Sequence, residues 1–188
     1  MQRLRHHTGN PLANIKMKYI IQIVLFLLVT QLKLSAQEMI DEAKLEFELP
    51  NEHWSFTVRQ VHGNTIVYTY KRDFILDSSN RKIVPQISFI IEPVDSTIDI
   101  IQYSILKRSK VPFEVIKMFS HKDGTMKFQY GVGYQGKYED RELEHRIYVV
   151  HGIYNSMGIT LIMDTTEEIA DIVTPEFLMC LATFDTMK

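Results

Sequence analysis

Residues 141–164 read RELEHRIYVVHGIYNSMGITLIMD, and this segment holds the longest uninterrupted β-strand pattern in the chain. Side chains alternate between the two faces of a strand, so the pattern of polar and apolar residues shows which faces are covered. The segment starts with a charged face at Glu142 and Glu144 and then becomes apolar on both faces, and the returning run 159–163 shows almost no alternation. Because strands that are apolar on both faces are covered on both, the segment predicts a hairpin that runs from an exposed rim into the middle of a sheet.

The rest of the chain predicts more strands and two main helices. Asn155 and Gly158 both tolerate positive φ and are expected to form the turn of the hairpin. Alternating or β-branched runs predict strands at 45–49, 54–61, 65–70, 87–92, 113–119 and 126–132. Runs of strands joined by hairpins, together with two helices, indicate an α+β fold with a mainly antiparallel sheet. The strands that are apolar on both faces favour helices on both sides of that sheet.

The two helices differ in how they are expected to begin. Ser96 and Asp99 have the spacing of a capping box, which opens the first helix. Its apolar residues then recur at the spacing of an amphipathic helix: Ile98, Ile101, Ile105 and Leu106. Thr174 and Pro175 are expected to open the last helix. Residues 73–85 show no clear period and are expected to form a loop, and 131–136 a flexible connector into the hairpin.

The first 36 residues have the features of a secretory signal peptide. Lys16 and Lys18 precede an apolar run at 19–29, and the small residues before Gln37 predict cleavage near Ala36. The apolar run is shorter than the roughly 20 residues that a membrane span needs, although an uncleaved N-terminal anchor is the alternative. Met17 is an alternative translation start, which would leave residues 1–16 untranslated. We therefore expect a leader at 1–36 and a single exported domain at 37–188, located in the periplasm or outside the cell and not integral to the membrane after cleavage.

The charge of the expected mature chain excludes some partners. The leader holds five of the 21 basic residues and none of the 23 acidic ones, so 16 basic and 23 acidic residues remain, a net charge of −7. An acidic body argues against binding to nucleic acid and to anionic membrane surfaces. Cys180 is the only cysteine, so no internal disulfide can form and the domain has to rely on its core.

Two motifs resemble functional signatures but lack their context. Residues 131–136 match G-x-G-x-x-G, yet a strand pattern follows where dinucleotide binding requires a helix. Ser104 and Lys107 match the serine–lysine motif S-x-x-K, but the partner motifs of those enzymes are absent from the sequence. We interpret both matches as structural.

The titratable residues show no strong site pattern either. His145 and His151 lie on one strand face but about 20 Å apart at the rise of a strand, too far to share a metal. The acidic residues 139–144 could hold calcium, although a solvated strand rim explains them as well. Cys180 lies among apolar residues and is expected to be a buried, inert thiol. The sequence names no cofactor and no metal ligand.

The order of elements resembles the PsbP-like family over residues 45–186. The features that carry this resemblance are the Trp54 region after a short Leu-Pro strand, the helix after Glu92 and Pro93, the long hairpin with the run 158–161, and the final helix ending at 181–184. The resemblance implies an α/β/α sandwich around a central, mainly antiparallel sheet. It also implies a non-catalytic role, since members are mostly accessory proteins: extrinsic photosystem subunits, assembly factors, a nuclear-transport regulator and exported bacterial proteins of unknown role. No metal-binding residue of the photosystem member can be matched here.

Three functional hypotheses follow. The first is a non-catalytic binding or accessory module of the cell envelope, with another envelope protein or a small ligand as its partner. The expected contact surfaces are the loop 73–85 and the rim 133–144, above all Arg141, Glu142 and Glu144, because binding residues tend to lie on loops over a rigid scaffold. The second is an envelope hydrolase that uses acidic and histidine residues at 139–145. The third is a small-ligand carrier, which needs a cavity between sheet and helix.

Overall fold

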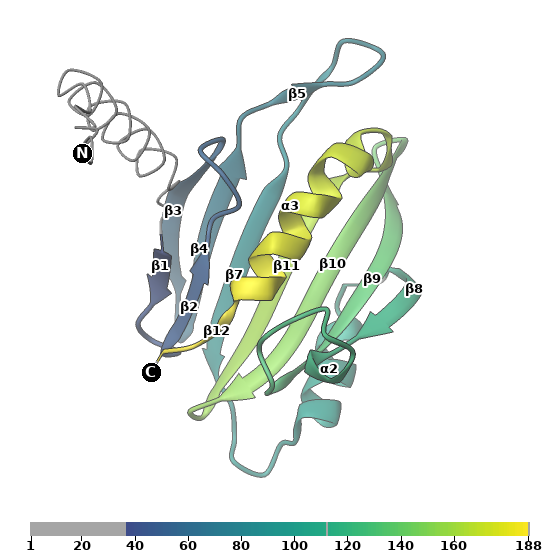
Figure 1. Ribbon diagram of the computed structural model, residues 1–188. Helices are drawn as coiled ribbons and strands as arrows, with labels where there is room; N and C mark the ends of the chain where they lie inside the picture. The colour runs from purple at the N-terminus through teal and green to yellow at the C-terminus, as the bar shows by residue number, and fades with distance from the viewer. Residues whose placement is uncertain (1–36, 112, 188) are drawn as a thin grey trace, which may run out of the picture. The chain divides into compact units, whose positions relative to one another are not determined.

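A seven-stranded antiparallel sheet forms the centre of the structure (Figure 1). The computed structural model describes residues 37–111 and 113–187. Within these ranges the strand order is β3 (Trp54–His62), β4 (Thr65–Arg72), β7 (Gln86–Pro93), β11 (Met157–Thr166), β10 (Leu143–Tyr154), β9 (Gly131–Asp140) and β8 (Glu114–Phe119). The predicted hairpin is the pair β10–β11, and it lies in the middle of the sheet between β7 and β9.

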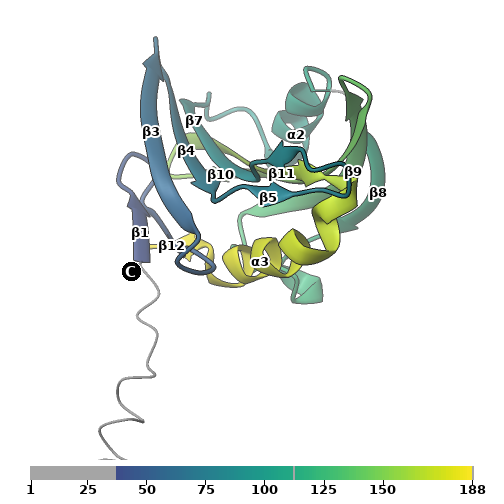
Figure 2. The same cartoon turned by 90° about the horizontal axis from the view of Figure 1, so that it is seen from above.

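One helix lies on each side of the sheet (Figure 2). Helix α3 (Ala170–Thr183) follows the short 3₁₀ turn η2 (Glu167–Ile169), and its Phe177 ring lies 6.0 Å from the ring of Tyr148 on β10. Helix α2 (Ile100–Arg108) packs on the other face, where Ser104 bonds to His151 of the same strand. Positions 148 and 151 have opposite parity, so they point to opposite faces of β10. The prediction of an α+β fold with an α/β/α arrangement around an antiparallel sheet is confirmed.

A smaller sheet completes the layer that contains α3. Strands β1 (Gln37–Ile40), β2 (Leu45–Glu48) and β12 (Asp185–Thr186) pair in the order β1-β2-β12. Phe47 of β2 packs on the main sheet with its ring 4.7 Å from Phe89, and Phe184 lies 5.6 Å from the same ring. The main hydrophobic core therefore lies between the sheet and the layer of α3, β2 and β12.

A buried ion pair between Glu176 and Arg72 ties α3 to the β3–β4 edge of the sheet. The Glu176 carboxylate accepts from Trp54 Nε1 at 2.8 Å and from Arg72 Nε at 2.8 Å. It also accepts from Asn51 Nδ2 at 2.9 Å. Burial alone would raise the pKa of Glu176, but the hydrogen bonds from Arg72, Asn51 and Trp54 outweigh it and leave the pKa below its usual value. Because each oxygen of this carboxylate has partners, the group serves the structure.

The hairpin turn uses different residues from those predicted. Asn155 and Ser156 have φ values of 53° and 61°, and they connect Tyr154 to Met157 as a two-residue turn. Gly158 lies instead in β11, where a Cβ atom would meet Tyr103 Cε2 at 2.7 Å and Val94 Cγ2 at 2.5 Å. Gly158 is therefore needed for the close approach of α2 and its preceding loop, not for the turn.

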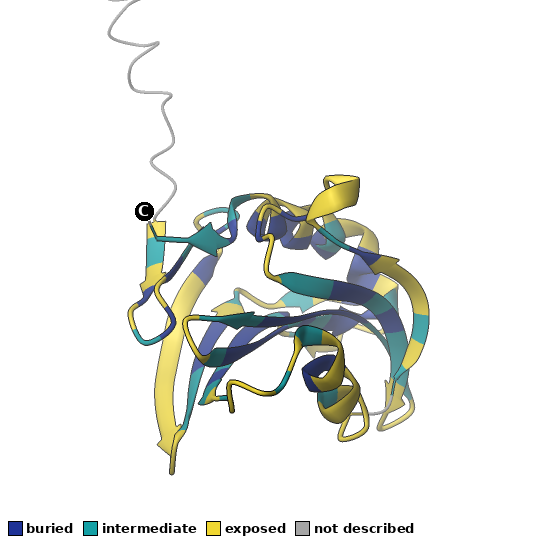
Figure 3. Ribbon diagram, turned by 90° about the horizontal axis from the view of Figure 1, so that it is seen from below, coloured by how far each residue is buried: buried dark blue, intermediate teal, exposed yellow. Residues whose placement is uncertain are grey.

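Helix α2 faces the sheet with the side opposite to the one predicted. Its buried residues are Tyr103 and Ser104, whereas the apolar stripe is exposed, with Ile101 at 58%, Ile105 at 63% and Leu106 at 51%. Figure 3 shows α2 coloured mostly as exposed, in contrast to the buried side of α3. The capping box is also shifted, since Asp99 caps the helix with Gln102 as its partner.

The segment before β10 differs from the prediction in two places. Residues 126–130, predicted as part of a strand, do not form one. The chain there packs against the C-terminal end of α3, where the backbone N–H of Lys127 donates to Leu181 O at 3.1 Å. The expected connector 131–136 is instead the first part of β9. A Cβ atom on Gly133 would lie 2.1 Å from the Phe119 ring, so this glycine leaves room for an aromatic ring against the strand.

Two shorter segments complete the described chain. The expected loop 73–85 contains a small hairpin, β5 (Ile75–Leu76) with β6 (Lys82–Ile83). The 3₁₀ turn η1 (His121–Asp123) follows β8.

The predicted leader, the cleavage site near Ala36 and the alternative start at Met17 lie outside the described residues. No helix among the residues that the structure describes is long and apolar enough to span a membrane.

Candidate binding site beside helix α2

An open groove of about 960 Å³ lies at the rim of the sheet, next to the C-terminal end of α2. The β9–β10 turn forms one side of it, and Arg141 and Glu142 hold the positive φ values, 49° and 65°, of that turn. The residues that line the groove come from α2, the segment after it, β8, β9 and β10: Arg108, Val111, Phe113, Glu114, Lys137, Tyr138, Glu139, Glu142 and Glu144. The groove therefore contains two of the three rim residues that the sequence singles out.

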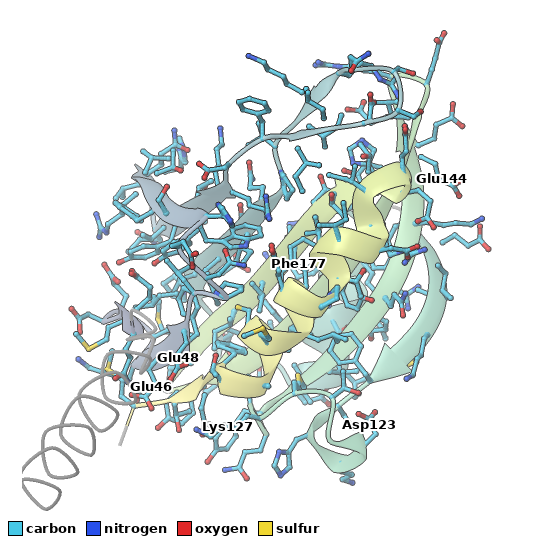
Figure 4. The ribbon with its side chains drawn as sticks, turned by 45° about the horizontal axis from the view of Figure 1, so that its top comes forward. Glu46, Glu48, Asp123, Lys127, Glu144 and Phe177 are labelled. Carbon is cyan, nitrogen blue, oxygen red and sulfur yellow. The ribbon has the colours of Figure 1, made fainter. Side chains whose placement is uncertain are left out.

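The predicted rim residues have distinct positions. Glu142 and Glu144 line the groove, and Figure 4 shows Glu144 at the end of the sheet opposite Asp123 and Lys127. Arg141 lies in the same turn, but it does not line the groove, and 90% of its side chain is exposed. The structure thus brings Glu142 and Glu144 to one surface and leaves Arg141 at its edge.

The groove carries both charge signs. Lys137 Nζ lies 3.3 Å from Glu144 Oε1 and 3.8 Å from Glu114 Oε2. The bond to Glu144 and the charge of Glu114 raise the pKa of Lys137. The guanidinium of Arg108 lies 4.8 Å from the centre of the Tyr134 ring and 5.9 Å from that of Phe113, an arrangement that favours a cation over the ring face. A partner with mixed charge and an apolar contact would match this surface.

The residues of the hydrolase hypothesis do not converge. Glu144 and His145 are adjacent in β10 and therefore point to opposite faces of the sheet. His145 Nδ1 lies 3.1 Å from Asp164 Oδ1, and its ring stacks on Tyr138 with 4.8 Å between ring centres. Burial raises the pKa of Asp164, and the nearby His145 offsets part of that rise. Within the described ranges, no group of three His, Cys, Asp or Glu residues is placed to hold a metal ion.

A separate cavity of about 170 Å³ lies between the C-terminal half of α2 and the sheet. Its walls come from β7, α2 with the segment after it, β10 and β11: Ile90, Lys107, Arg108, Lys110, Val111, Phe113, Val149, His151, Thr160 and Ile162. The third sequence hypothesis requires a cavity between sheet and helix, and this is such a cavity. It shares Arg108, Val111 and Phe113 with the larger groove.

A chain of buried hydrogen bonds adjoins this cavity. Ser104 Oγ lies 2.7 Å from Tyr134 OH and 2.9 Å from His151 Nδ1. Burial lowers the pKa of His151 to about 4, with smaller contributions from the charges of Lys107 and Arg108. His151 is therefore neutral at pH 7. The cluster satisfies three polar groups between α2 and the sheet, which explains why the Ser104 side of the helix packs inward.

The serine–lysine motif does not form a serine–lysine pair. Lys107 makes a salt bridge with Glu92 and lies over the Tyr103 ring, 5.3 Å from its centre. The Ser104 side chain is buried, with 2% of the residue exposed, and its hydroxyl is hydrogen-bonded to His151 Nδ1. A serine nucleophile of the hydrolase type needs an accessible hydroxyl and a base that a third group orients. The contacts of Ser104 are those of a structural hydroxyl.

Two other sequence candidates have structural surroundings. In the 73–85 segment, buried Asp77 accepts from Arg81 Nε at 2.5 Å, and Glu168 accepts from the Ser78 backbone N–H, so this expected contact loop is tied to η2. Burial raises the pKa of the Cys180 thiol to about 12, in line with the expected inert cysteine.

Comparisons with known proteins find similarity in structure only. No family model and no curated protein matches the chain. The solution structure of cyanobacterial PsbP (CyanoP) from Synechocystis sp. PCC 6803 is similar with a TM-score of 0.48 and 15% identity, over 80% of this chain and 91% of that one. A crystal structure from Bacteroides thetaiotaomicron VPI-5482 at 1.50 Å resolution is similar with a TM-score of 0.45 and 9% identity, over 82% of this chain. The chain spans about half the length of that Bacteroides protein, 49%.

The resemblance to the PsbP-like family that the sequence predicts is thus found in the structure, at low sequence identity. It concerns the arrangement of strands and helices. No functional residue is transferred from either structure to this chain.

Proposed function

We propose that this protein is an exported, non-catalytic binding module of the cell envelope whose protein partner docks in the groove between the β9–β10 turn and the end of α2. The observation that carries the proposal is the groove itself, about 960 Å³ in volume and open at the surface. It combines Arg108, Val111 and Phe113, whose side chains suit the centre of an interface, with carboxylates and Lys137 that suit its polar rim. The location in the envelope rests on the predicted signal peptide.

The contacts around the groove support binding over catalysis. An active site needs titratable groups that meet in one pocket with a reactive geometry. His145 is bonded to Asp164 on one face of β10, whereas Glu144 lies near Lys137 on the other. The hydrolase alternative has no comparable observation in its favour among the described residues.

A pull-down tests the groove. Mature chain 37–188 is used as bait in an envelope extract, next to a variant in which Arg141, Glu142 and Glu144 are all changed to alanine. The matched control changes Asp41, Glu48 and Lys71 to alanine, which alters the net charge equally at exposed positions away from the groove. We expect one protein to be captured by the wild type and by the control and to be lost from the groove variant. Equal capture by all three forms would refute the groove as the docking site.

A small-ligand carrier is the second candidate function. The cavity of about 170 Å³ under α2 favours it, because a carrier needs an enclosed space that the sheet and a helix line together. This function is compatible with the first, since a ligand under α2 would lie beside the docking groove.

A further inference from the structure

The size of the cavity under α2 limits its ligand to a compact molecule. Its volume is about 170 Å³. An engineered protein cavity of about 150 Å³ lined by apolar side chains takes up benzene. The walls here include Ile90, Val149 and Ile162 from three adjacent strands. The cavity therefore suits one aromatic ring or a short branched hydrocarbon chain.

The charges around the cavity select the sign of the ligand. Lys107, Arg108 and Lys110 all contribute to the lining, which contains no carboxylate. Lys107 is neutralised by its salt bridge to Glu92. Within the described parts of the chain, neither Arg108 nor Lys110 forms a salt bridge to a carboxylate. Two cations, Arg108 and Lys110, therefore remain at a cavity wall that has no carboxylate of its own, and they favour an anionic group.

Arg108 is held in place to receive such an anion. Its guanidinium lies against the Tyr134 and Phe113 rings, at 4.8 Å and 5.9 Å from their centres. Contacts of a guanidinium with aromatic rings do not consume its five N–H donors, which remain available for hydrogen bonds. A planar carboxylate accepts two parallel hydrogen bonds from a guanidinium, so the geometry suits a carboxylate better than a halide.

His151 supplies a second polar contact within the cavity. Its Nδ1 is engaged by Ser104, and Nε2 has no hydrogen-bond partner among the described residues. The ring is 2% exposed and lines the cavity beside Thr160. A ligand in the cavity would therefore contact the imidazole ring and the Thr160 side chain.

We propose that the cavity under α2 binds a small apolar monocarboxylate, with its hydrocarbon part between Ile90, Val149 and Ile162 and its carboxylate on Arg108. This inference rests on the second candidate function, the small-ligand carrier. The cavity shares Arg108, Val111 and Phe113 with the docking groove, so the two proposals are tested with separate variants. An aromatic acid of the size of benzoate represents the ligand class.

Binding to the purified protein tests this inference with three probes of similar shape: benzoate, uncharged toluene and cationic benzylamine. Affinities are measured from amide chemical-shift changes in a titration. We expect benzoate to bind most tightly, toluene more weakly and benzylamine least, with the largest shifts at Val149, His151 and Ile162. A wild-type protein that binds none of them, or that binds benzoate no better than benzylamine, overturns the proposal.

Three variants locate the site. Arg108→Gln should weaken benzoate about tenfold, the loss expected for one charge-assisted hydrogen-bonded pair, and leave toluene unchanged. Ile162→Phe, which fills the cavity, should weaken benzoate and toluene alike. Arg59→Gln, the matched control on β3, should alter neither affinity. If Arg108→Gln leaves benzoate unchanged, or if shifts fall outside the cavity, the assignment is wrong.

The same titration on the groove variant separates the two proposals. The changes at Arg141, Glu142 and Glu144 lie outside the cavity lining. Benzoate affinity should therefore stay at the wild-type value in that variant, even where it no longer captures a protein partner. Loss of partner capture without loss of benzoate binding supports both sites, and loss of benzoate binding there contradicts the location of the cavity site.

Discussion

His151 is the residue on which the packing of α2 depends most directly. Its ring centre lies 6.2 Å from that of Tyr103 and 5.7 Å from that of Tyr134, and Nδ1 bonds to Ser104. Burial and the nearby Lys107 and Arg108 hold its pKa near 4, against 6.5 in an exposed histidine. Charging this ring inside the structure would cost free energy, so the neutral form is part of the fold.

This low pKa predicts an acid-sensitive contribution to stability. The unfolded chain takes up a proton on His151 as the pH falls through 6.5, whereas the folded protein does so only near pH 4. Stability is therefore lost between these two values and the loss levels off below pH 4. Between pH 7.5 and 4.5 we expect this group to account for about 2 to 3 kcal/mol.

Urea denaturation of the wild type and of His151→Gln at both pH values measures this contribution. The variant lacks the titrating group but keeps polar atoms next to Ser104. Other groups titrate equally in the two proteins, so the difference in their acid-induced loss isolates His151. If both proteins lose the same free energy of unfolding, the histidine is not held neutral by its surroundings.

At the scale of single elements, α2 shows how a polar side of a helix can be the buried one. The sequence stripe of Ile101, Ile105 and Leu106 is exposed, and Tyr103 and Ser104 pack inward. The inward side chains find partners on β11, β10 and β9: Thr160, His151 and Tyr134. Hydrogen bonds to these strands, which local periodicity cannot reveal, decide the orientation.

Substitution of Ile105 tests the orientation of α2. Because Ile105 is 63% exposed, Ile105→Ser should change the free energy of unfolding by no more than about 0.5 kcal/mol. Tyr103→Ala, on the side of the helix that faces the sheet, removes a buried ring and should cost about 3 kcal/mol. Thermal and urea unfolding measure both values. A cost of 2 kcal/mol or more for Ile105→Ser would mean that the apolar stripe is buried after all.

Strand β9 depends on glycines for a different reason from a nucleotide-binding loop. A Cβ atom at Gly133 would approach the Phe119 ring to 2.1 Å. Gly133→Ala should therefore destabilise the protein by about 1 to 3 kcal/mol through overpacking. Gln135→Ala, two residues further along the strand, is the control and should cost less than 1 kcal/mol.

A double-mutant cycle with Phe119→Leu identifies the contact. The smaller side chain makes room for the new methyl group, so the double variant should lose clearly less stability than the sum of the two single changes. Additive losses in urea denaturation would show that Gly133 is required by the strand backbone and not by the Phe119 ring.

At the scale of the whole molecule, the sheet separates a dry core from a partly open face. Helix α3 and the small sheet cover one face with aromatic and aliphatic side chains. The shorter α2 covers part of the other face, and its C-terminal end borders both the groove and the cavity. The cavity lies on this open side, and the groove extends from the end of α2 around the rim formed by β8, β9 and β10.

The elements that local sequence predicts correctly are those with a clear pattern of apolar residues. The β10–β11 hairpin was predicted from residues 141–164, because strands covered on both faces leave a long apolar signal. The rim at Glu142 and Glu144 was visible for the related reason that the strand begins charged. Their use as a contact surface stays a prediction.

The features that sequence alone did not reveal depend on contacts between distant segments. Gly131 to Gly136 were interpreted as a connector, since the pattern does not show that aromatic rings from β8 and the segment before β9 lie against them. Ser104 and His151 are 47 positions apart, so their hydrogen bond and the cavity beside it emerge only when α2 is placed on the sheet. The one sequence signal for this hydrogen-bond cluster is His151, a polar residue within the otherwise apolar second half of β10.

The measurement that tests the proposed function most directly is site-specific photocrosslinking in the intact envelope. A photoreactive amino acid is placed at position 142 in the groove and, as a matched control, at the exposed position 41 in the β1–β2 turn. A groove that docks a protein partner should give one defined crosslinked species from position 142 and none from position 41. No crosslink from position 142, or the same species from both positions, would contradict the groove as the binding surface.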